Sequence, residues 1–346
     1  MSITTTEDTP TLFPGINPSL LQAAMALITP AQRIALLAHE HPDGDCLGSA
    51  FGFAHILEQL GKTCTVACAD PAPGDFSFMP GIASLQKSLG DERFDLVIAL
   101  DAGELTRYGK IYEQHKAFLD SATILNIDHH VSSNGCGKVS IIDPTAAATA
   151  ELLVLFQQQA HLPLTKDAAI CLLTGLITDT FSFQFTSTTP RTMEAGAVLL
   201  RAGAVAETIV QPLFRTRSMA SMRFQAAIIR NAQTACDGRI IWSYATDQTL
   251  KEADALAEMD DNFSGMLRDI EGVQIAAFFK SYGEPDVTRL SLRAAAPYNA
   301  AEICLRLGGG GHPRAAGATL HHPLNEAIEL VIGELKREIT TQDGKL

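Results

Sequence analysis

Residues 34–45 read Ile-Ala-Leu-Leu-Ala-His-Glu-His-Pro-Asp-Gly-Asp. The continuous apolar run Ile34–Ala38 is typical of a strand that is buried on both faces. A polar turn follows it, and apolar residues then recur at helical spacing from Leu47 to Leu60, with Gly61 as the expected C-cap. A buried strand that leads through a tight turn into a helix indicates the start of a parallel α/β domain.

The same alternation continues through the N-terminal half of the chain. Apolar runs predict further strands at Thr63–Ala69, Phe94–Leu100, Ala122–Ile127 and Val139–Ile142, and helical patterns follow at Thr145–Gln159 and Thr165–Ile177. Strands alternating with helices predict an α/β fold, a mostly parallel sheet with helices on both faces.

The C-terminal part has a different pattern. A helical stretch without strand signal runs from about Pro190 through Phe224. It is followed by strands near Arg239–Tyr244, Val273–Lys280 and Val287–Arg293, a helix near Ala300–Leu307, a glycine run, and an amphipathic helix from Leu324 to about Ile339. This order predicts a smaller α+β domain. We therefore expect a loose leader at 1–16, a first domain at 17–205, a helical linker at 206–225 and a second domain at 226–343, a division that suits a length of 346 residues.

The composition limits the partners. A formal net charge of −13 argues against long nucleic acid such as duplex DNA as the main partner, although it allows a short oligonucleotide in a local cationic cleft. No run of about 18 uninterrupted apolar residues exists, so we expect no membrane span. The first residues lack the basic and apolar regions of a signal peptide. The seven cysteines include no CxxC pair and read as buried apolar residues rather than a disulfide framework, so we expect a cytoplasmic protein.

Three of the predicted strands end in residues that can bind metals. In open α/β sheets ligands bind beyond the carboxyl ends of the strands, so these residues should meet. They are His39, Asp43 and Asp45 after the first strand, Asp101 after the third, Asp128-His129-His130 after the fourth, and Asp179, which follows the apolar helical segment at 168–177.

Imidazole and carboxylate ligands together favour Mn²⁺, Zn²⁺, Fe²⁺ or Co²⁺ over Ca²⁺. Two such ions about 3.5–4 Å apart can generate a nucleophile and clamp the attacking and leaving oxygens of a phosphoryl transfer. Taken singly, each motif has an ordinary structural explanation. Asp45 stands where a helix N-cap would, and a His-His pair at a strand end is usually a surface feature.

Together the motifs resemble those of the DHH phosphoesterase superfamily. They stand, in the family's order, as HEHPDGDCLGSA, FDLVIALDAG, NIDHHVS and GLITDTFSF. The resemblance implies one ion held by His39, Asp43 and Asp101, and a second held by Asp45, Asp101, His129 and Asp179, with Asp101 bridging. It also implies that Asp128 orients a histidine, and that His130 stabilises the charge on the phosphoryl group or assists the leaving oxygen.

A second resemblance lies in the C-terminal part. The run Gly308–His312, followed by Ala315-Ala316-Gly317, is similar to the signature of the DHH-associated substrate domain. Consecutive glycines allow backbone N–H groups to approach a phosphate closely. The resemblance implies that Arg293 and a loop of Gly310, Gly311 and His312 bind substrate. Arg314 is an additional candidate contact outside the family pattern.

The length and two-domain layout resemble the stand-alone nanoRNase and pAp-phosphatase branch. This implies a two-metal phosphoesterase, with Mn²⁺ as the expected ion and Mg²⁺, Co²⁺ or Zn²⁺ as alternatives. Its substrates would be short oligonucleotides or 3′-phosphoadenosine 5′-phosphate (pAp). The alternatives are a cyclic-dinucleotide or pApA phosphodiesterase, a RecJ-like single-strand exonuclease, and a nucleotide-binding sensor without activity. The sequence leaves the oligomeric state open, although a homodimer is common in related proteins.

Overall fold

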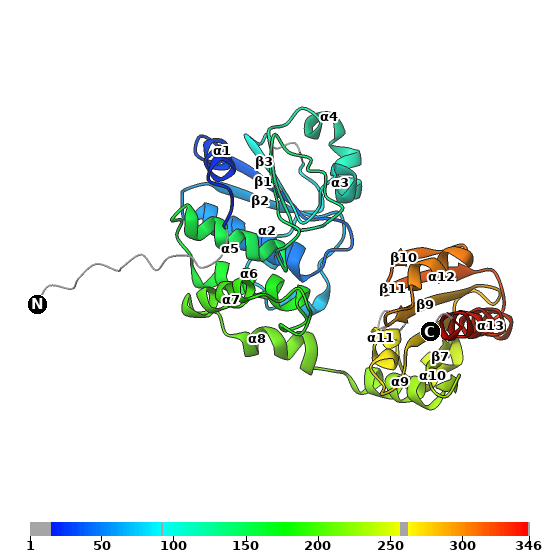
Figure 1. The fold of residues 1–346 in the computed structure, drawn as a ribbon. Coiled ribbons are helices and arrows are strands. Elements are labelled where there is room, and N and C mark those ends of the chain that lie inside the picture. Colours follow the sequence, from blue (N-terminus) through cyan, green and yellow to red (C-terminus); the bar gives the residue numbers. More distant parts are fainter. Residues whose placement is uncertain (1–14, 91–92, 257–261, 345–346) are drawn as a thin grey trace, which may run out of the picture. The chain divides into compact units, whose positions relative to one another are not determined.

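The computed structural model describes residues 15–90, 93–256 and 262–344 (Figure 1). The chain divides into two compact units, Met1–Thr216 and Arg217–Leu346. The expected linker at 206–225 contains helix α8 (Ala206–Val210), a π-helical segment (Gln211–Arg215) and the start of α9 (Met219–Arg230). Most of the expected leader lies outside the described residues. Ile16 is buried, and its N–H donates a hydrogen bond to Oε1 of Gln159.

The first unit is built on a five-stranded parallel sheet, which confirms the predicted fold class. Its strand order is β2-β1-β3-β4-β5, and every pair is parallel. The strands are β1 (Arg33–Leu37), β2 (Thr63–Ala67), β3 (Leu96–Leu100), β4 (Ile124–Asp128) and β5 (Val139–Ile142). The predicted strand ends differ from these by up to two residues.

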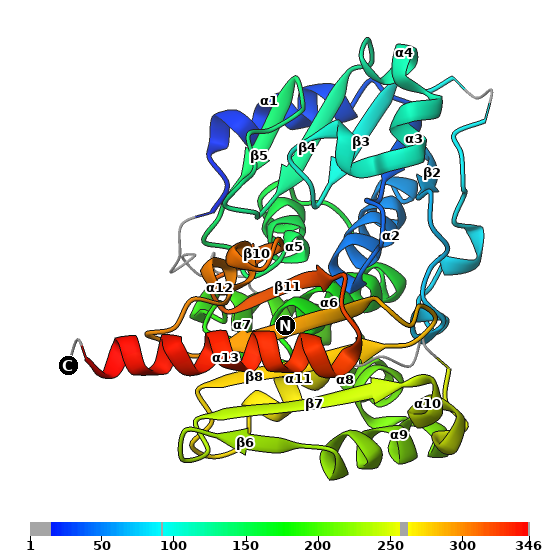
Figure 2. The ribbon, with the colours of Figure 1, turned by 90° about the vertical axis from the view of Figure 1, so that its right-hand side faces the viewer.

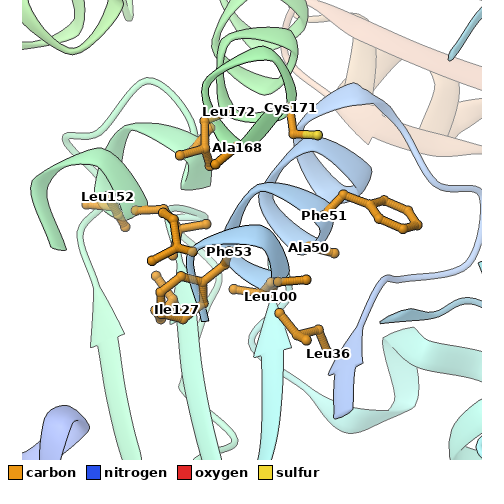
Figure 3. Packing of buried hydrophobic residues seen from close by; sticks show 14 of the residues in the cluster. Leu36, Ala50, Phe51, Phe53, Leu100, Ile127, Leu152, Ala168, Cys171 and Leu172 are labelled. Atoms are coloured by element: carbon orange, nitrogen blue, oxygen red, sulfur yellow. The ribbon is translucent and has the colours of Figure 1, made fainter. Parts of the chain in front are cut away.

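Both faces of this sheet are buried, as the continuous apolar runs require. In β1, Ile34 and Leu36 join the core that is shared with the larger helices, whereas Ala35 and Leu37 join a second core on the opposite face. The larger helices are α1 (Pro18–Ile28), α2 (Gly44–Glu58), α5 (Thr149–Gln159), α6 (Lys166–Asp179) and α7 (Pro190–Arg201). The opposite face carries a 3₁₀ turn (Leu105–Tyr108), α3 (Gly109–Gln114) and α4 (Lys116–Leu119); two further 3₁₀ turns lie at Gly74–Phe76 and Ile82–Ser84. Figure 3 shows Phe51 and Phe53 of α2 packed among side chains from β1, β3, β4 and α6.

Helices α2 and α6 approach unusually closely because glycines line the contact. A Cβ atom added at Gly48 would lie 2.4 Å from the backbone oxygen of Cys171 and 2.9 Å from the backbone nitrogen of Gly175. Neither of these backbone atoms can rotate away. The close approach matters for the site described below, because α2 begins beside Asp45 and α6 ends with Asp179.

We expect Gly48→Ala to lower the free energy of unfolding of the first unit by about 1–3 kcal/mol, the usual cost of overpacking. Gly333→Ala is the matched control, since Gly333 lies inside helix α13 (Leu324–Asp343) and an added Cβ would meet nothing within 4 Å. That control should be neutral or stabilising by up to about 1 kcal/mol, because alanine favours a helix more than glycine does. Urea unfolding followed by circular dichroism tests the first variant, and fluorescence of Trp242, the single tryptophan, reports on the control. A Gly48→Ala protein as stable as the wild type would contradict this account of the contact.

The second unit has a six-stranded mixed sheet of order β10-β11-β9-β8-β7-β6 (Figure 2). Only β7 and β8 pair in parallel. The strands are β6 (Gln233–Ala235), β7 (Ile240–Thr246), β8 (Ile275–Ser281), β9 (Thr288–Ala294), β10 (Gly310–His312) and β11 (Ala315–Leu320). Helices α12 (Ala300–Arg306) and α13 contribute to the core on one face, and α9, α10 (Asp247–Ala253) and α11 (Phe263–Arg268) to the smaller clusters on the other.

The prediction that Gly310, Gly311 and His312 form a loop is wrong. They form strand β10 at the edge of the sheet, paired with β11 in the register Gly310↔Gly317 and His312↔Ala315. A Cβ at Gly311 would lie 2.6 Å from the backbone oxygen of Ala315, so glycine permits the close pairing here. Strands β6 and β11 and helices α1, α3, α4, α10 and α11 were not predicted.

Among the described residues, no single helix is long and apolar enough to cross a membrane. Helix α7 and the segment Ala206–Arg215 are together long and apolar enough to cross a membrane, by length and composition only. The two are bent by 104° relative to each other.

Candidate metal centre

The sequence-predicted ligands gather at the carboxyl ends of β1, β3 and β4. His39 lies two residues beyond β1, Asp101 directly follows β3, and His129 directly follows β4. Helix α2, which follows the first turn, supplies Asp45, and α6 supplies Asp179 as its last residue. Parallel pairing of the three strands therefore places side chains from five segments at one edge of the sheet.

Asp101 occupies the middle of this cluster. Its Oδ2 lies 3.5 Å from Nε2 of His39, and its Oδ1 lies 3.6 Å from Nε2 of His129. The backbone of Asp101 has a positive φ of 59°, while its N–H donates to the carbonyl of Ile127 in β4. This conformation turns the chain sharply where β3 ends and leaves one carboxylate oxygen beside each imidazole.

A second group of ligand atoms forms on the far side of His129. Nε2 of His129 lies 3.2 Å from Oδ2 of Asp179 and 3.9 Å from Oδ2 of Asp45. Asp45 is fully buried, whereas Asp179 is partly exposed. The ligand atoms of Asp45, His129 and Asp179 all lie within 4.8 Å of one another, as do those of Asp101, His129 and His130.

The two imidazoles present the correct nitrogen to this cluster. Nδ1 of His39 lies 2.8 Å from the carbonyl of Glu40, and Nδ1 of His129 lies 3.2 Å from the carbonyl of Ala146. A carbonyl can only accept, so each Nδ1 carries a hydrogen and each ring presents Nε2 to the carboxylates, with a free lone pair when the ring is neutral. Within the described part of the chain, the buried Nε2 of His129 has no hydrogen-bond partner. A cation therefore fits between these imidazole nitrogens and the carboxylates that they face.

The excess of carboxylates in the cluster also favours the binding of cations. Burial, and then the charges of Asp101 and Asp179, raise the pKa of Asp45 well above its usual range. Enclosure by neighbouring atoms, and then the charge of Asp101, likewise raise the pKa of Asp43, although this residue keeps an exposed surface. Burial alone would lower the pKa of His129, but contact with Asp179 and the charges of Asp45 and Asp101 raise it to about 10. Bound divalent ions would remove this repulsion.

Asp43, not Asp45, is the N-cap of helix α2. Oδ1 of Asp43 accepts from the N–H of Cys46 at 2.9 Å. Asp43 is absent from the groups of candidate ligands that form within the described ranges, whereas the other five predicted ligands each belong to one. Cys46 is an unpredicted neighbour. Its Sγ accepts from the N–H of His39 at 3.1 Å and lies within the group formed with His39 and Asp101. Burial holds the pKa of this thiol well above its usual range.

The start of helix α5 holds two of the carboxylates in place, a role that the sequence did not indicate. The N–H groups of Thr149 and Ala150 donate to the two oxygens of Asp45, at 2.6 and 3.0 Å. The hydroxyl of Thr149 donates to Oδ1 of Asp101 at 2.9 Å. The predicted helix begins at Thr145, four residues early, and so conceals the free N–H groups at this terminus.

A buried ion-pair network anchors the same segment from behind. Arg191 at the start of α7 lies 2.5 Å from Glu151 and 2.9 Å from Asp143. The other carboxylate oxygen of Glu151 accepts from the N–H of Ala147 and the hydroxyl of Thr192, at 3.2 and 2.7 Å. The segment between Asp143 and Glu151 is thus fixed at both ends, and the carbonyl that orients His129 belongs to it.

Asp128 and His130 form a pair at the edge of the cluster. Oδ1 of the buried Asp128 lies 2.8 Å from Nδ1 of the half-exposed His130, and that nitrogen is 3.8 Å from Oδ1 of Asp101. Burial acts to raise the pKa of Asp128, but the hydrogen bonds from His130 and Ser133 together outweigh it and the pKa is lowered. Asp128 thus orients His130, with the imidazole directed at the centre of the cluster.

The predicted substrate contacts all lie in the second unit. His312 of β10 pairs with Ala315 of β11, which pairs with Arg293 of β9. Directly opposed residues project from the same face, so His312 and Arg293 share one cross-strand row. The guanidinium of Arg293 donates to Oδ1 of Asn262 at 3.0 Å, and burial lowers its pKa. Arg314 lies in the β10–β11 turn, where its carbonyl accepts from the N–H of Ala294.

Comparison with known proteins identifies the family of the chain. The family model of the DHH family N-terminal domain matches residues 33–176, and that of the DHHA1 domain matches residues 238–340. The chain is 30% identical over 314 residues to the bifunctional oligoribonuclease and PAP phosphatase NrnA of Thermus thermophilus, covering 89% of this chain and 90% of that protein. The chain belongs to the DHH family.

Two further similarities are to a longer relative and to a solved structure. The cyclic-di-AMP phosphodiesterase PdeA of Listeria monocytogenes is 28% identical, over 86% of this chain but 46% of that protein. The structure of an exopolyphosphatase-related protein from Bacteroides fragilis superposes with a TM-score of 0.84 at 22% identity, covering 94% of this chain and 98% of that one. This structural likeness shows the fold.

Proposed function

We propose that the protein is a two-metal phosphoesterase that hydrolyses short oligonucleotides and pAp. The observation that carries the proposal is the position of Asp101, with one carboxylate oxygen beside His39 and the other beside His129. One aspartate between two sets of ligands suits a pair of ions that share a bridging carboxylate. The name of the NrnA relative, which matches this chain over nearly the full length of both, supports the choice of substrates.

We assign His39, Asp43 and Asp101 to one ion, and Asp45, Asp101, His129 and Asp179 to the other. Mn²⁺ suits this mixture of imidazole and carboxylate, and Mg²⁺, Co²⁺ and Zn²⁺ are the alternatives. Such a pair, when bound, activates water and neutralises charge on the phosphoryl group. The chain itself orients the imidazoles through backbone carbonyls and holds Asp45 and Asp101 against the start of α5.

His130 has a separate role in the proposal. Its Nδ1 is paired with Asp128, so the protonated ring can donate from Nε2 to a phosphoryl or leaving oxygen. In the second unit, Arg293 and His312, which share one row of the sheet, are proposed to bind the distal phosphate of the substrate. All seven cysteines are free thiols, which supports a reducing compartment such as the cytoplasm.

Turnover of a substrate panel tests the proposed function. The purified protein is assayed with Mn²⁺ and with EDTA on pAp, pApA, cyclic-di-AMP, a five-nucleotide RNA and a thirty-nucleotide DNA. We expect metal-dependent turnover of pAp and the short RNA, with the long DNA spared. Preference for the long DNA would indicate a RecJ-like exonuclease. If the protein binds these nucleotides without metal and turns over none of them, the result would indicate a nucleotide sensor.

A second candidate is cleavage of cyclic-di-AMP or its linear product pApA. The match to PdeA, which spans 86% of this chain, favours it. Because this chain covers 46% of PdeA, the activity of that whole protein does not transfer directly. Relative kcat/KM values for cyclic-di-AMP, pApA and pAp within the same panel separate the two candidates.

A further inference from the structure

The second unit carries an open groove of about 450 Å³ that none of the roles above uses. Two cationic side chains from neighbouring strands, Lys280 of β8 and Arg289 of β9, line one part of it. Gly308, Gly309 and Gly317 line another. Walls made of glycine expose the backbone and admit a ligand closely.

The groove continues the face that carries Arg293 and His312. Arg289 pairs with Lys280 on one side and with Thr319 of β11 on the other, so all three project from one face in a single row. Ser291 forms the next row and Arg293 the one after, because alternate residues of a strand share a face. The opposite face is filled by Leu290 and Leu292 in the core with α12 and α13.

The distance between the row of Arg289 and the row of Arg293 indicates how long a ligand must be to contact both. Arg293 lies four positions after Arg289 on β9, which corresponds to about 13 Å at about 3.3 Å per residue. Stacked nucleotides advance about 3.4 Å each, and an unstacked strand advances more. Because pAp carries two phosphates, one for the reaction and one for Arg293, only a longer strand has a further phosphate for the row of Arg289.

The charges in the groove suit a phosphate backbone. Burial, followed by the charge of Arg289, lowers the pKa of the half-buried Lys280, so the two cations are close enough to repel. Arg289 lies 3.8 Å from Glu284, but both side chains are exposed and such a contact contributes little. In a chain with a net charge of −13, two adjacent cations beside a glycine wall form a local site for an anion.

We propose that Lys280 and Arg289 form a phosphate subsite for the oligonucleotide backbone, several nucleotides from the phosphate held at Arg293. The inference rests on the proposed function and extends it. The subsite makes turnover depend on substrate length, because only the longer oligonucleotides occupy it. Mononucleotides such as pAp leave it empty.

The test compares the wild type with Lys280→Ala/Arg289→Ala on two substrates, a five-nucleotide RNA and pAp, in Mn²⁺. We expect kcat/KM for the RNA to fall about tenfold or more, through KM, relative to kcat/KM for pAp. The slope of log kcat/KM against log salt for the RNA should become shallower by about 1.4, since each phosphate contact on a single strand contributes about 0.7. Lys336→Ala/Arg337→Ala removes the same charge from α13 and should change neither quantity.

The outcomes distinguish a failure of the phosphate subsite from a failure of the proposed function. Equal losses on RNA and pAp, or an unchanged salt slope, would overturn the subsite while leaving the phosphoesterase in place. If the wild type turns over neither substrate in any metal, the proposed function itself fails. In that case, binding of a fluorescent five-nucleotide RNA that the double variant does not weaken would overturn the subsite as well.

Discussion

Asp101→Asn is expected to reduce turnover of pAp and short RNA by about a thousandfold or more. Two-metal stabilisation of a phosphoryl transition state contributes several kcal/mol, and every 1.36 kcal/mol changes the rate tenfold. Asp101 is the one predicted ligand that lies beside both His39 and His129, so its loss affects both proposed ion sites. Steady-state kinetics across a range of Mn²⁺ concentrations measures the effect.

Asparagine is a better probe here than alanine. Asp101 has a φ of 59°, and asparagine tolerates this left-handed conformation better than other non-glycine residues. Its amide oxygen can still accept from the hydroxyl of Thr149. Without metal, the variant should be at least as stable as the wild type, because it removes a negative charge that raises the pKa values of Asp45 and Asp43.

Thermal unfolding supplies a readout that is independent of activity. Mn²⁺ should raise the Tm of the wild type, since a ligand that binds only the folded state stabilises it. Asp101→Asn should lose most of this increase. Asp120→Asn, at an exposed carboxylate paired with Lys116, is the control and should retain both turnover and the increase. A normal Mn²⁺-dependent increase in Asp101→Asn would refute the bridging assignment.

Much of the candidate site could be predicted because its proposed ligands lie next to local sequence patterns. His39 and Asp101 stand directly after continuous apolar runs, His129 follows a strand that contains Asn126 and Asp128, and parallel strands bring such ends together. The run Ile34–Ala38 and the turn after it are contiguous in sequence, so the position of His39 needed no knowledge of distant contacts. The four-motif resemblance then linked Asp179 to the same place, although it lies on a helix.

The parts of the site that the sequence did not predict depend on contacts between distant segments. Thr149 touches Asp45 and Asp101 across 104 and 48 residues of sequence, and no periodicity reports such a contact. Arg191 lies in a stretch that shows only a helical pattern, although the network that it forms is buried. Strand β10 was missed for a different reason. Glycine is depleted in strands, so the glycine run favours a loop, whereas in the structure it pairs with β11.

Arg191→Met is expected to lower the free energy of unfolding of the first unit by about 3–5 kcal/mol, the usual result of removing one partner from a buried ion pair. Glu151 is fully buried, and the substitution leaves its charge facing an apolar side chain. The double variant Glu151→Gln/Arg191→Met should recover part of the loss, because the uncompensated charge is then absent. Urea unfolding of the wild type, both single variants and the double variant gives the coupling energy. Arg201→Met, at an exposed arginine of the same helix, is the matched control and should change stability little.

A positioning role for Arg191 predicts more than instability. The segment that its network anchors supplies the Ala146 carbonyl, which orients His129, and the Thr149 contacts to Asp45 and Asp101. Loosening this segment should raise the Mn²⁺ concentration needed for half-maximal turnover by about tenfold or more, as substitutions behind metal ligands commonly do. The measurement is made well below the Tm, where the variant is folded. Recovery of kcat at high Mn²⁺ would show that the ligands are intact but less well ordered. An unchanged Mn²⁺ requirement in a destabilised protein would restrict Arg191 to folding, because the ligand positions would then not depend on its network.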